Sequence, residues 1–514
     1  MSKSAASPEV ESSRLDRREF VRATAAASAL TILPRHVFGG PGRVAPSDRL
    51  NIAQIGCGTQ GIRQVDVELI QREDLQITCV CDPNTDSTNY VDWNLDTNRT
   101  MVRELLGDPT WGRQDGGVRA GREVARQIIE RYYGRENRNG NSSGPRSYAD
   151  FRELIDRETD LDAAVVITPD HTHATIAIAL LEAGIAAISH KPVSNVVHEV
   201  RRAVEAARGA SVPSHLLAFG DFPDYYRIAS WIASGRIGTV REVHNWTSRP
   251  FWPQGRLNYP TEELSVPSGF DWDLWLGPVP YRPYHPDYTF AVYRGWYDFG
   301  GGCFADMGNY SLWGVYRLLD LEAPISVEAR ANSIPFLNED RIAQRTLSQV
   351  SYPLAGTLRF RHAARGERPA VDVYWYEGGI RPQTPSELLD LDEEIAPEGM
   401  MFVGDGGKIL CNFRGLDPRL FVNGVEVEQE QSSDEPEAEV VSGTDEWIAA
   451  VKNGTKSRGS FEGVAPLAEA TALQGIAFRF AGQRLDWDAS TMSVTNVPGA
   501  NELTRREYRP GWEL

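Results

Sequence analysis

Three glycines lie between an apolar segment and an amphipathic one, spaced as Gly56-x-Gly58-x-x-Gly61. Residues 50–55 form an apolar run that predicts a buried strand, and apolar side chains at helical spacing continue from 62 to 70. In such a strand–turn–helix the first glycine permits a tight turn and the second lets the backbone approach a diphosphate. The third lets the helix pack against the strand. The spacing therefore predicts a dinucleotide-binding Rossmann domain.

An acidic residue follows the next predicted strand. Residues 75–81 are apolar and end at Asp82, about 20 residues after the last glycine of the turn. A carboxylate at that position accepts hydrogen bonds from the ribose hydroxyls of the adenosine half and repels a 2′-phosphate. NAD is therefore favoured as the cofactor, while NADP stays possible. Thr59 and Gln60, inside the glycine turn, are expected to contact the same cofactor.

Two polar loops follow further predicted strands of this domain. The strand at 161–168 leads into Thr168-Pro169-Asp170-His171-Thr172-His173, and the strand at 186–189 leads into His190-Lys191-Pro192. The carboxyl ends of parallel strands meet at one edge of a sheet, where ligands bind. No third ligand stands near the two histidines of the first loop, so we expect them to line the cleft and to hold no metal. The expected cofactor contacts from these loops are Thr168, Pro169, His173, His190 and Lys191.

The order of these segments resembles the Gfo/Idh/MocA family of oxidoreductases. The resemblance also rests on Gly300–Tyr310 (Gly-Gly-Gly-Cys-Phe-Ala-Asp-Met-Gly-Asn-Tyr), Gly404–Lys408, Phe461-Glu462 and Leu485–Asp488. It implies an α/β chain with an N-terminal Rossmann dinucleotide-binding domain. It also implies a C-terminal α+β domain whose large, mostly antiparallel sheet forms one wall of the substrate site and joins copies of the chain into a homo-oligomer. Alternating side chains at 240–248 and 326–332 predict strands in that second domain.

The resemblance also implies a catalytic group of Lys191, Asp306 and Tyr310. The family usually has Glu-Lys-Pro where this chain has His190-Lys191-Pro192, and Lys191 is the matched functional residue. It would lie between the nicotinamide and the substrate and polarise the reacting oxygen. The family's Asp-x-Gly-x-His appears here as Asp306-Met307-Gly308-Asn309-Tyr310, and a tyrosine hydroxyl beside a cation can also exchange protons. The alternative interpretation is that Asp306 caps the following helix while Tyr310 is a core aromatic.

The tyrosine variant of this motif resembles the exported glucose–fructose oxidoreductase branch of the family, whose members hold a dinucleotide tightly. That branch typically uses NADP, which Asp82 argues against. The resemblance implies a sugar or polyol substrate, and the dense aromatic residues between 219 and 316 would suit sugar rings, although most such residues pack in cores or interfaces. Arg249, His285 and Arg294 are the expected polar substrate contacts.

The N-terminus carries the pattern of an export signal. Arg17 and Arg18 precede a mild apolar stretch at 23–33, as in twin-arginine signals, and the stretch is about half as long as a membrane span. We expect a signal at 1–38, a linker at 39–48, recognition by the twin-arginine export machinery, and a periplasmic or otherwise extracytoplasmic location. Since the free dinucleotide pool stays inside the cell, an exported enzyme must carry a tightly bound cofactor.

Composition and length limit the remaining possibilities. The 514 residues predict two domains, a Rossmann domain at 49–213 and a C-terminal domain at 214–514, with a polar surface insertion at about 86–146 that contains one helix near 121–133. A formal net charge of −18 argues against nucleic acid as a partner. The five cysteines form no disulfide framework, and we expect Cys79 and Cys81 on opposite faces of their strand.

Three functions are compatible with these features. The first is hydride transfer between a sugar or polyol and a bound nicotinamide. The second is glycoside cleavage, in which bound NAD oxidises a sugar carbon transiently and later returns the hydride. The third is a non-catalytic, sugar-binding protein that keeps the fold.

Overall fold

A computed structural model describes residues 44–45, 48–92, 94, 96–113, 116–136, 144–220, 222–290, 292–427 and 442–514. The chain divides into two compact units, Met1–Arg49 and Leu50–Leu514, and the description below concerns the second. The predicted signal at 1–38 and most of the predicted linker lie outside the described residues. Within the described ranges, no helix has the length and apolar character needed to cross a membrane.

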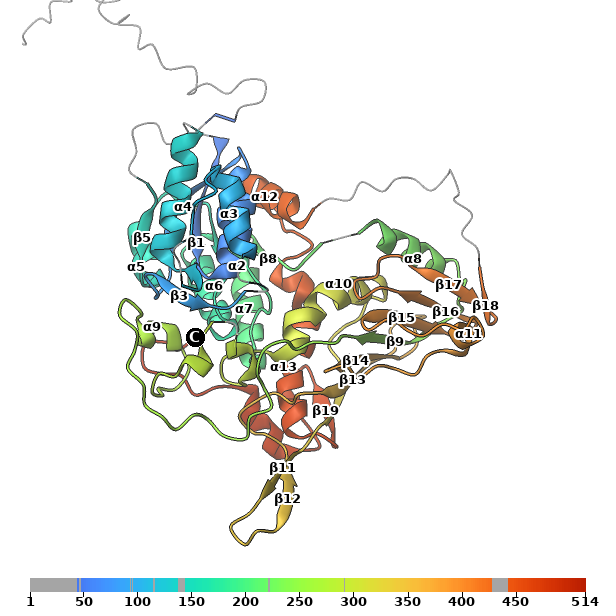
Figure 1. The fold of residues 1–514 in the computed structure, drawn as a ribbon. Coiled ribbons are helices and arrows are strands. Elements are labelled where there is room, and N and C mark those ends of the chain that lie inside the picture. Colours follow the sequence, from blue (N-terminus) through green and yellow to red (C-terminus); the bar gives the residue numbers. More distant parts are fainter. Residues whose placement is uncertain are drawn as a thin grey trace, which may run out of the picture. The chain divides into compact units, whose positions relative to one another are not determined.

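A parallel six-stranded sheet forms the first half of the Leu50–Leu514 unit (Figure 1). Its strands run in the order β5-β2-β1-β6-β7-β8, which is the doubly wound Rossmann order. The central strands are buried on both faces, as their unbroken apolar runs predict. The bounds are β1 Leu50–Ile55, β2 Leu75–Cys81, β5 Arg146–Tyr148, β6 Ala163–Val166, β7 Ala186–Ser189 and β8 Ser214–Leu216. The last strand pairs with β7 although it follows the predicted domain boundary at 213.

Helical segments cover both faces of this sheet. One face packs on the segment after the glycine turn, on α4 and on α12, and the other packs on α5, α6 and α7. Cys79 and Cys81 both face the α6–α7 side and Val80 faces the other. Our expectation of opposite faces for the two cysteines was wrong, because residues two apart in a strand share a face. The bounds are α2 Thr59–Gly61, η3 Ile62–Glu68, η4 Leu69–Gln71, α4 Arg122–Arg135, α5 Phe151–Arg157, η5 Asp170–Thr172, α6 His173–Glu182, α7 Val197–Gly209 and α12 Gly443–Asn453.

The region at 86–146 is more deeply buried against the sheet than the sequence predicts. It contains two helices, α3 (Thr97–Leu106) and α4, and a short hairpin of β3 (Ser87–Tyr90) and β4 (Val118–Ala120). Ile128, Ile129 and Tyr133 of α4 are almost fully buried against the sheet. The expectation of a surface insertion with one helix was therefore wrong, because α4 is the helix that connects β2 to β5 and covers the core.

The second half is built on a ten-stranded sheet in the order β18-β17-β16-β15-β9-β14-β13-β10-β19-β20. Neighbouring strands are antiparallel except β9 and β14, which confirms the expected mostly antiparallel sheet. The predicted strands at 240–248 and 326–332 are β9 and β10. The bounds are β9 Val240–Trp246, β10 Ser326–Ala331, β13 Gly356–His362, β14 Val371–Glu377, β15 Gly399–Gly404, β16 Gly407–Cys411, β17 Arg419–Val422, β18 Val425–Glu426, β19 Arg484–Asp488 and β20 Ser493–Val494.

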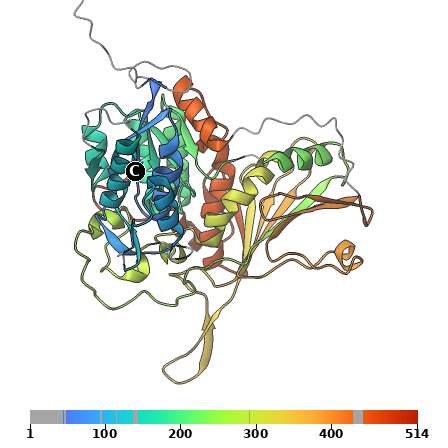
Figure 2. The ribbon, with the colours of Figure 1, turned by 45° about the horizontal axis from the view of Figure 1, so that its top comes forward.

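Helices α8, α10 and α13 lie along one face of this sheet (Figure 2). Alternate residues of β13 and β14, such as Phe360 and Trp375, point into the core beneath them, as a half-covered antiparallel sheet requires. A hairpin of β11 and β12 projects from the far end of the unit (Figure 1). The bounds are α8 Pro223–Ala233, η8 Phe304–Gly308, α10 Asn309–Leu318, β11 Ile334–Leu337, β12 Ala343–Thr346, α11 Ser386–Leu389, α13 Phe461–Arg479 and η9 Pro498–Thr504.

A long segment between β9 and η8 crosses the carboxyl edge of the Rossmann sheet. Its short helical turns are α9 (Trp272–Leu276), η6 (Pro286–Tyr288) and η7 (Val292–Gly295). Ten of its aromatic and aliphatic side chains form a separate buried cluster. Backbone contacts from Asn84 to Phe270 and from His171 to Phe299 tie it to the sheet edge. Much of the aromatic density noted in the sequence therefore builds this crossing segment, which we call the crossing arm (residues 247–303).

Candidate active site

The glycine turn between β1 and α2 leaves no room for larger side chains. Gly56 has a φ of +100°, and a Cβ built on it would lie 2.2 Å from the Ile167 carbonyl oxygen. A Cβ on Gly61 would lie 2.2 Å from the Gly56 carbonyl oxygen. A Cβ on Gly58 would lie 3.1 Å from the Tyr90 ring, so a larger residue here would press against that ring. The left-handed turn at Gly56 and the close packing at Gly61 are as the spacing predicts.

Asp82 stands at the end of β2 beside this turn. One carboxylate oxygen accepts the Cys57 backbone N–H at 2.7 Å, and the other accepts the Asn84 backbone N–H at 2.8 Å. Burial raises the pKa of Asp82 to about 6, and the two backbone donors oppose that rise. Each oxygen keeps a second lone pair, so the side chain can still accept hydrogen bonds from a ribose diol.

A cavity of about 1020 Å³, open mouth included, runs along the carboxyl edge of the Rossmann sheet. Its walls come from the glycine turn, the ends of β2, β6 and β7, the crossing arm, and the C-terminal tail. The predicted cofactor contacts that line it are Gly58, Thr59, Gln60, Gly61, Asp82, Thr168, Pro169 and His190. A glycine cradle at a helix start, with an acid at the end of the second strand, is the donor and acceptor set that a dinucleotide needs. The residues present therefore fit NAD.

Aromatic side chains cover this cavity from the side of the crossing arm. The rings of Tyr90 and Phe290 meet with centroids 4.0 Å apart, and the Tyr90 ring lies over Gly58. Trp275 of the arm and Trp512 of the C-terminal tail also line the cavity. No local spacing links these four residues to the glycine turn, so the sequence alone does not place them at the site.

His171 and His173 make hydrogen bonds to backbone carbonyl groups and do not line the cavity. The ring nitrogens of His173 contact the carbonyl oxygens of Pro192 at 2.7 Å and Thr168 at 2.9 Å. Those of His171 contact the carbonyl oxygens of Phe299 and Trp275. His173, a predicted cofactor contact, is thus a bridge between the two loops that line the cavity. Gly56 and Lys191 are likewise outside its lining.

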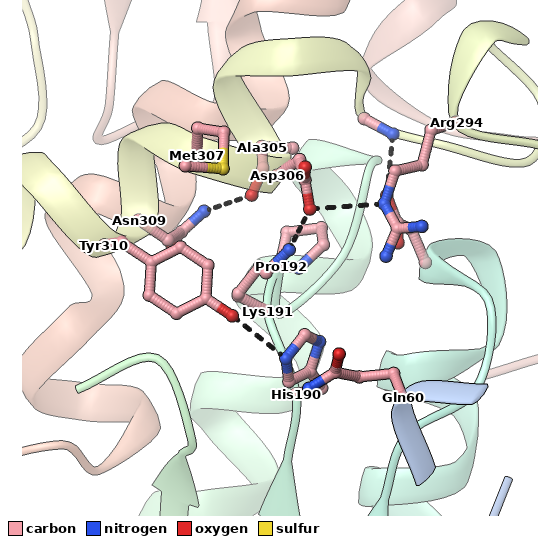
Figure 3. A network of polar contacts seen from close by, with 12 residues as sticks. Gln60, His190, Lys191, Pro192, Arg294, Ala305, Asp306, Met307, Asn309 and Tyr310 are labelled. Carbon is pink, nitrogen blue, oxygen red and sulfur yellow. Dashed lines mark hydrogen bonds and ion pairs between the residues drawn. The ribbon is translucent and has the colours of Figure 1, made fainter. Parts of the chain in front are cut away.

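Lys191, Asp306 and Arg294 meet at the end of the cavity near His190 (Figure 3). The Lys191 ammonium pairs with the Asp306 carboxylate, and the Arg294 Nε lies 3.3 Å from the same carboxylate oxygen. Their side chains are 2%, 10% and 15% exposed. Burial acts to raise the pKa of Asp306, but Lys191 and Arg294 outweigh it and hold that pKa below its usual value. Asp306 is therefore an anion shared by two buried cations.

Tyr310 and His190 form a second pair beside this group. The Tyr310 hydroxyl lies 3.2 Å from His190 Nε2, and the Lys191 ammonium stands 5.1 Å from the centre of the Tyr310 ring. Burial, followed by the nearby Lys191 charge, holds the pKa of His190 well below its usual value. His190 is neutral at pH 7, so one of its ring nitrogens can accept a proton. The two departures from the family motif thus contact each other.

The alternative interpretation of Asp306 as a helix cap is not what the structure shows. Asp306 lies inside η8, its side chain caps no helix, and it is directed to Lys191.

Asp170 lies in the loop after β6, and its sequence neighbours alone do not reveal its role at the site. Its two oxygens accept the Gly301 backbone N–H at 2.9 Å and the Tyr293 hydroxyl at 3.2 Å. Asp170 thereby anchors the turn that precedes Asp306.

The three predicted substrate contacts fall in different places. Arg294 lines the cavity. Arg249 lies 3.8 Å from Glu398 and contributes to the low pKa of Asp306. His285 lies outside the cavity lining, where its ring accepts the Asp287 backbone N–H and caps η6.

Two family models match this chain. Residues 119–216 match the model described as "Oxidoreductase family, NAD-binding Rossmann fold". Residues 233–354 match "Oxidoreductase family, C-terminal alpha/beta domain". The first covers the Rossmann strands from β5 to β8, and the second covers the crossing arm and the segment that contains Asp306.

Curated relatives match over shorter stretches. Levoglucosan dehydrogenase of Pseudarthrobacter phenanthrenivorans is 30% identical over 114 residues, which cover 21% of this chain and 29% of that protein. Inositol 2-dehydrogenase 2 of Saccharopolyspora erythraea is 31% identical over 106 residues, covering 20% of this chain and 31% of that protein. This chain therefore spans about a third of the length of these curated relatives.

A solved structure shares the fold across most of the chain. The WlbA dehydrogenase of Bordetella pertussis, solved in complex with NADH and UDP-GlcNAcA, superposes with a TM-score of 0.51 at 15% identity. The match covers 86% of this chain and 99% of that one. The two family models of Gfo/Idh/MocA oxidoreductases thus match parts of both halves of this chain in their chain order, and the solved structure shows the same fold.

Proposed function

We propose that the protein transfers hydride between a sugar or polyol carbinol and a nicotinamide dinucleotide, preferentially NAD. The observation that carries this proposal is the meeting of Lys191, Asp306, Tyr310 and His190 at one end of a cavity that fits a dinucleotide. The names of the relatives, a levoglucosan dehydrogenase and an inositol 2-dehydrogenase, support a sugar or polyol substrate.

Each side chain has a role in this reaction. Bound nicotinamide would supply the hydride acceptor. Lys191, held by Asp306, donates a hydrogen bond to the reacting oxygen and stabilises the negative charge that develops on it. The Tyr310 hydroxyl takes the substrate's hydroxyl proton while passing its own proton to His190 Nε2. Nε2 of the neutral imidazole carries the lone pair for that proton, and burial together with the Lys191 charge makes His190 a weak base that returns the proton readily.

The cofactor is proposed to be retained between turnovers. The Tyr90–Phe290 contact crosses above the glycine turn, and Trp275 and Trp512 close further parts of the cavity wall. A ligand that leaves has to part these side chains. A retained cofactor must be reset by a second half-reaction, on another substrate or on the same one.

Export by the twin-arginine route is part of the same proposal, based on Arg17 and Arg18. Replacing both by lysine should leave the protein in the cytoplasm, as cell fractionation would measure. Periplasmic recovery of the double variant would contradict export by this route.

We also propose a homo-oligomer that forms through the sheet face opposite α10 and α13. On that face, the rings of His244 and Tyr374 stack with centroids 4.7 Å apart, and Tyr376 lies beside them. Light scattering should give a mass that is a multiple of the chain mass. A monomer at micromolar concentration would contradict this arrangement.

One experiment separates the three functions. The purified protein is denatured, the released dinucleotide is identified, and the native protein is offered free sugars, polyols and aryl glycosides. Reduction of the bound cofactor by a free sugar or polyol supports the proposal. Release of the aglycone without accumulation of reduced cofactor supports glycoside cleavage instead. Absence of both dinucleotide and turnover supports a sugar-binding protein and contradicts the proposal.

A further inference from the structure

Arg294 holds hydrogen-bond donors that the described residues do not use. Its guanidinium donates no hydrogen bond to any described residue, and its one ion pair is the 3.3 Å approach of Nε to Asp306. The same Asp306 oxygen already accepts from Lys191. The Nε that makes this ion pair is the buried nitrogen, whereas the two outer nitrogens are not buried, and a ligand acceptor in the cavity that Arg294 lines can reach them.

Neighbouring acids in the part of the chain that the structure describes accept no hydrogen bond from these donors. Asp170 accepts instead from the Gly301 backbone N–H and the Tyr293 hydroxyl. The Asp306 and Asp170 charges favour the charged form of Arg294, but Asp170 makes no ion pair with it within the described residues.

The backbone holds Arg294 in a fixed position. A Cβ on Gly300 would lie 2.3 Å from the Arg294 Cα, so the two backbone segments are in direct contact. The guanidinium also packs 4.8 Å from the Tyr293 ring centre and 5.9 Å from that of Trp252. Figure 3 shows its outer nitrogens pointing away from Asp306, toward the side where Gln60 and His190 lie, and those two residues line the same cavity.

We propose that Arg294 binds a carboxylate of the substrate, so that the preferred substrates are sugar acids, such as uronates or aldonates, rather than neutral sugars. A guanidinium presents its donors as a planar fork that matches the two oxygens of a carboxylate. Its contact with Asp306, the partner of Lys191, puts that fork beside the reacting centre. This inference rests on the proposed function and specifies its substrate class.

The test compares the activity of the holoenzyme on the acid and neutral forms of the same sugar, for two sugars. D-glucuronate, its neutral methyl ester and D-glucose are offered, together with D-galacturonate and its methyl ester. We expect kcat/KM for at least one uronate to exceed that of its ester by at least about 100-fold, because the ester leaves the guanidinium without its charged partner. Equal or better use of the neutral forms would overturn the inference.

Two variants assign the preference to this side chain. Arg294→Gln should lower kcat/KM for the uronate by about 100-fold and that for the neutral ester by less than about threefold, and Arg294→Lys should recover only part of the loss. Arg256→Gln is the matched control, because Arg256 pairs with Asp287 on the same arm, outside the cavity lining. An equal loss on acid and ester, or weaker NAD retention with the acid preference intact, would show that Arg294 serves the fold or the cofactor instead.

Binding keeps this test independent of turnover. If no sugar or sugar acid changes the cofactor's absorbance, the proposed function fails, and calorimetry with glucuronate and galacturonate decides the inference. Saturable uronate binding that Arg294→Gln abolishes would support it, and absence of uronate binding would overturn it. Melting curves confirm that each variant is folded.

Discussion

The glycine turn and the catalytic group are assembled in opposite ways. The turn and its acid, Gly56 to Asp82, come from one strand–turn–helix–strand segment, and most of their close contacts are to backbone atoms. Lys191 and Asp306 are 115 residues apart and meet through side chains alone. The glycine turn depends on the conformation of the backbone, whereas the catalytic group depends on the charges of its side chains. Substitutions in the two regions should therefore have different effects.

The largest effect is expected at Lys191. Lys191→Ala removes the donor to the reacting oxygen, and kcat/KM should fall by about 10³-fold or more. The dinucleotide should still be retained, because the glycine turn and Asp82, which we expect to hold it, are unchanged. Assays of the purified holoenzyme measure both. Lys456→Ala, on an exposed lysine, is the control, and activity within tenfold of the wild type would show that the catalytic group is wrongly assigned.

The second-largest effect is expected at Gly56, where a substitution should weaken cofactor binding without removing any catalytic side chain. Gly56→Ala forces a Cβ to within 2.2 Å of the Ile167 carbonyl at a φ of +100°. The turn must shift, so the dinucleotide Kd should rise by at least about 100-fold and the melting temperature should fall.

Gly184→Ala is the matched control for that change. Gly184 has a φ of +77° and nothing within 4 Å of an added Cβ, so it reports backbone strain alone, on the order of 1 kcal/mol. Cofactor retention by Gly56→Ala equal to that of Gly184→Ala would contradict the close approach that we describe.

A smaller loss is expected at Tyr310. Tyr310→Phe removes the hydroxyl that relays the proton to His190, and kcat should fall by about 10²-fold with an altered pH profile. Tyr316 offers a control on the same helix, because its hydroxyl lies 3.4 Å from His362 Nε2 and outside the cavity lining. Equal, small effects of Tyr310→Phe and Tyr316→Phe would show that the Tyr310–His190 contact is structural.

The smallest effect follows from the pKa of Asp82, which burial raises to about 6. Ribose hydroxyls need the ionised carboxylate as acceptor, so NAD affinity should fall about tenfold per pH unit below 6. The stability of the unliganded protein should depend on pH in the opposite sense, and should fall over the pH range in which NAD affinity rises. A raised carboxyl pKa favours the protonated native state, and this contribution is lost as pH rises from about 4 to about 6. Titrations of NAD binding and melting temperature from pH 4 to 8 measure both, and a flat NAD affinity would show that Asp82 does not contact the ribose.

Residue spacing predicted the cofactor-binding turn in detail, whereas the catalytic group was predicted only from the resemblance to the family. The roles of Gly56, Gly58 and Gly61 follow from spacing, because a tight turn and close packing are local requirements. Spacing could not reveal that His173 bridges two loops or that Asp170 anchors the turn before Asp306, since both act across the chain. His285 shows the opposite error, because its polar character predicted a substrate contact where the fold uses it as a cap.

The sequence by itself determined the Rossmann architecture, the cofactor cradle and the identity of the chemical groups. Those features depend on period, spacing and residue type, which are properties of short segments. Tertiary structure alone decided that Arg294 lines the cavity beside Asp306, that Tyr310 reaches His190, and that Tyr90, packed on Phe290 of the crossing arm, lies over the glycine turn. Each of these depends on segments far apart in the chain, and packing of the two sheets around one core brings them together.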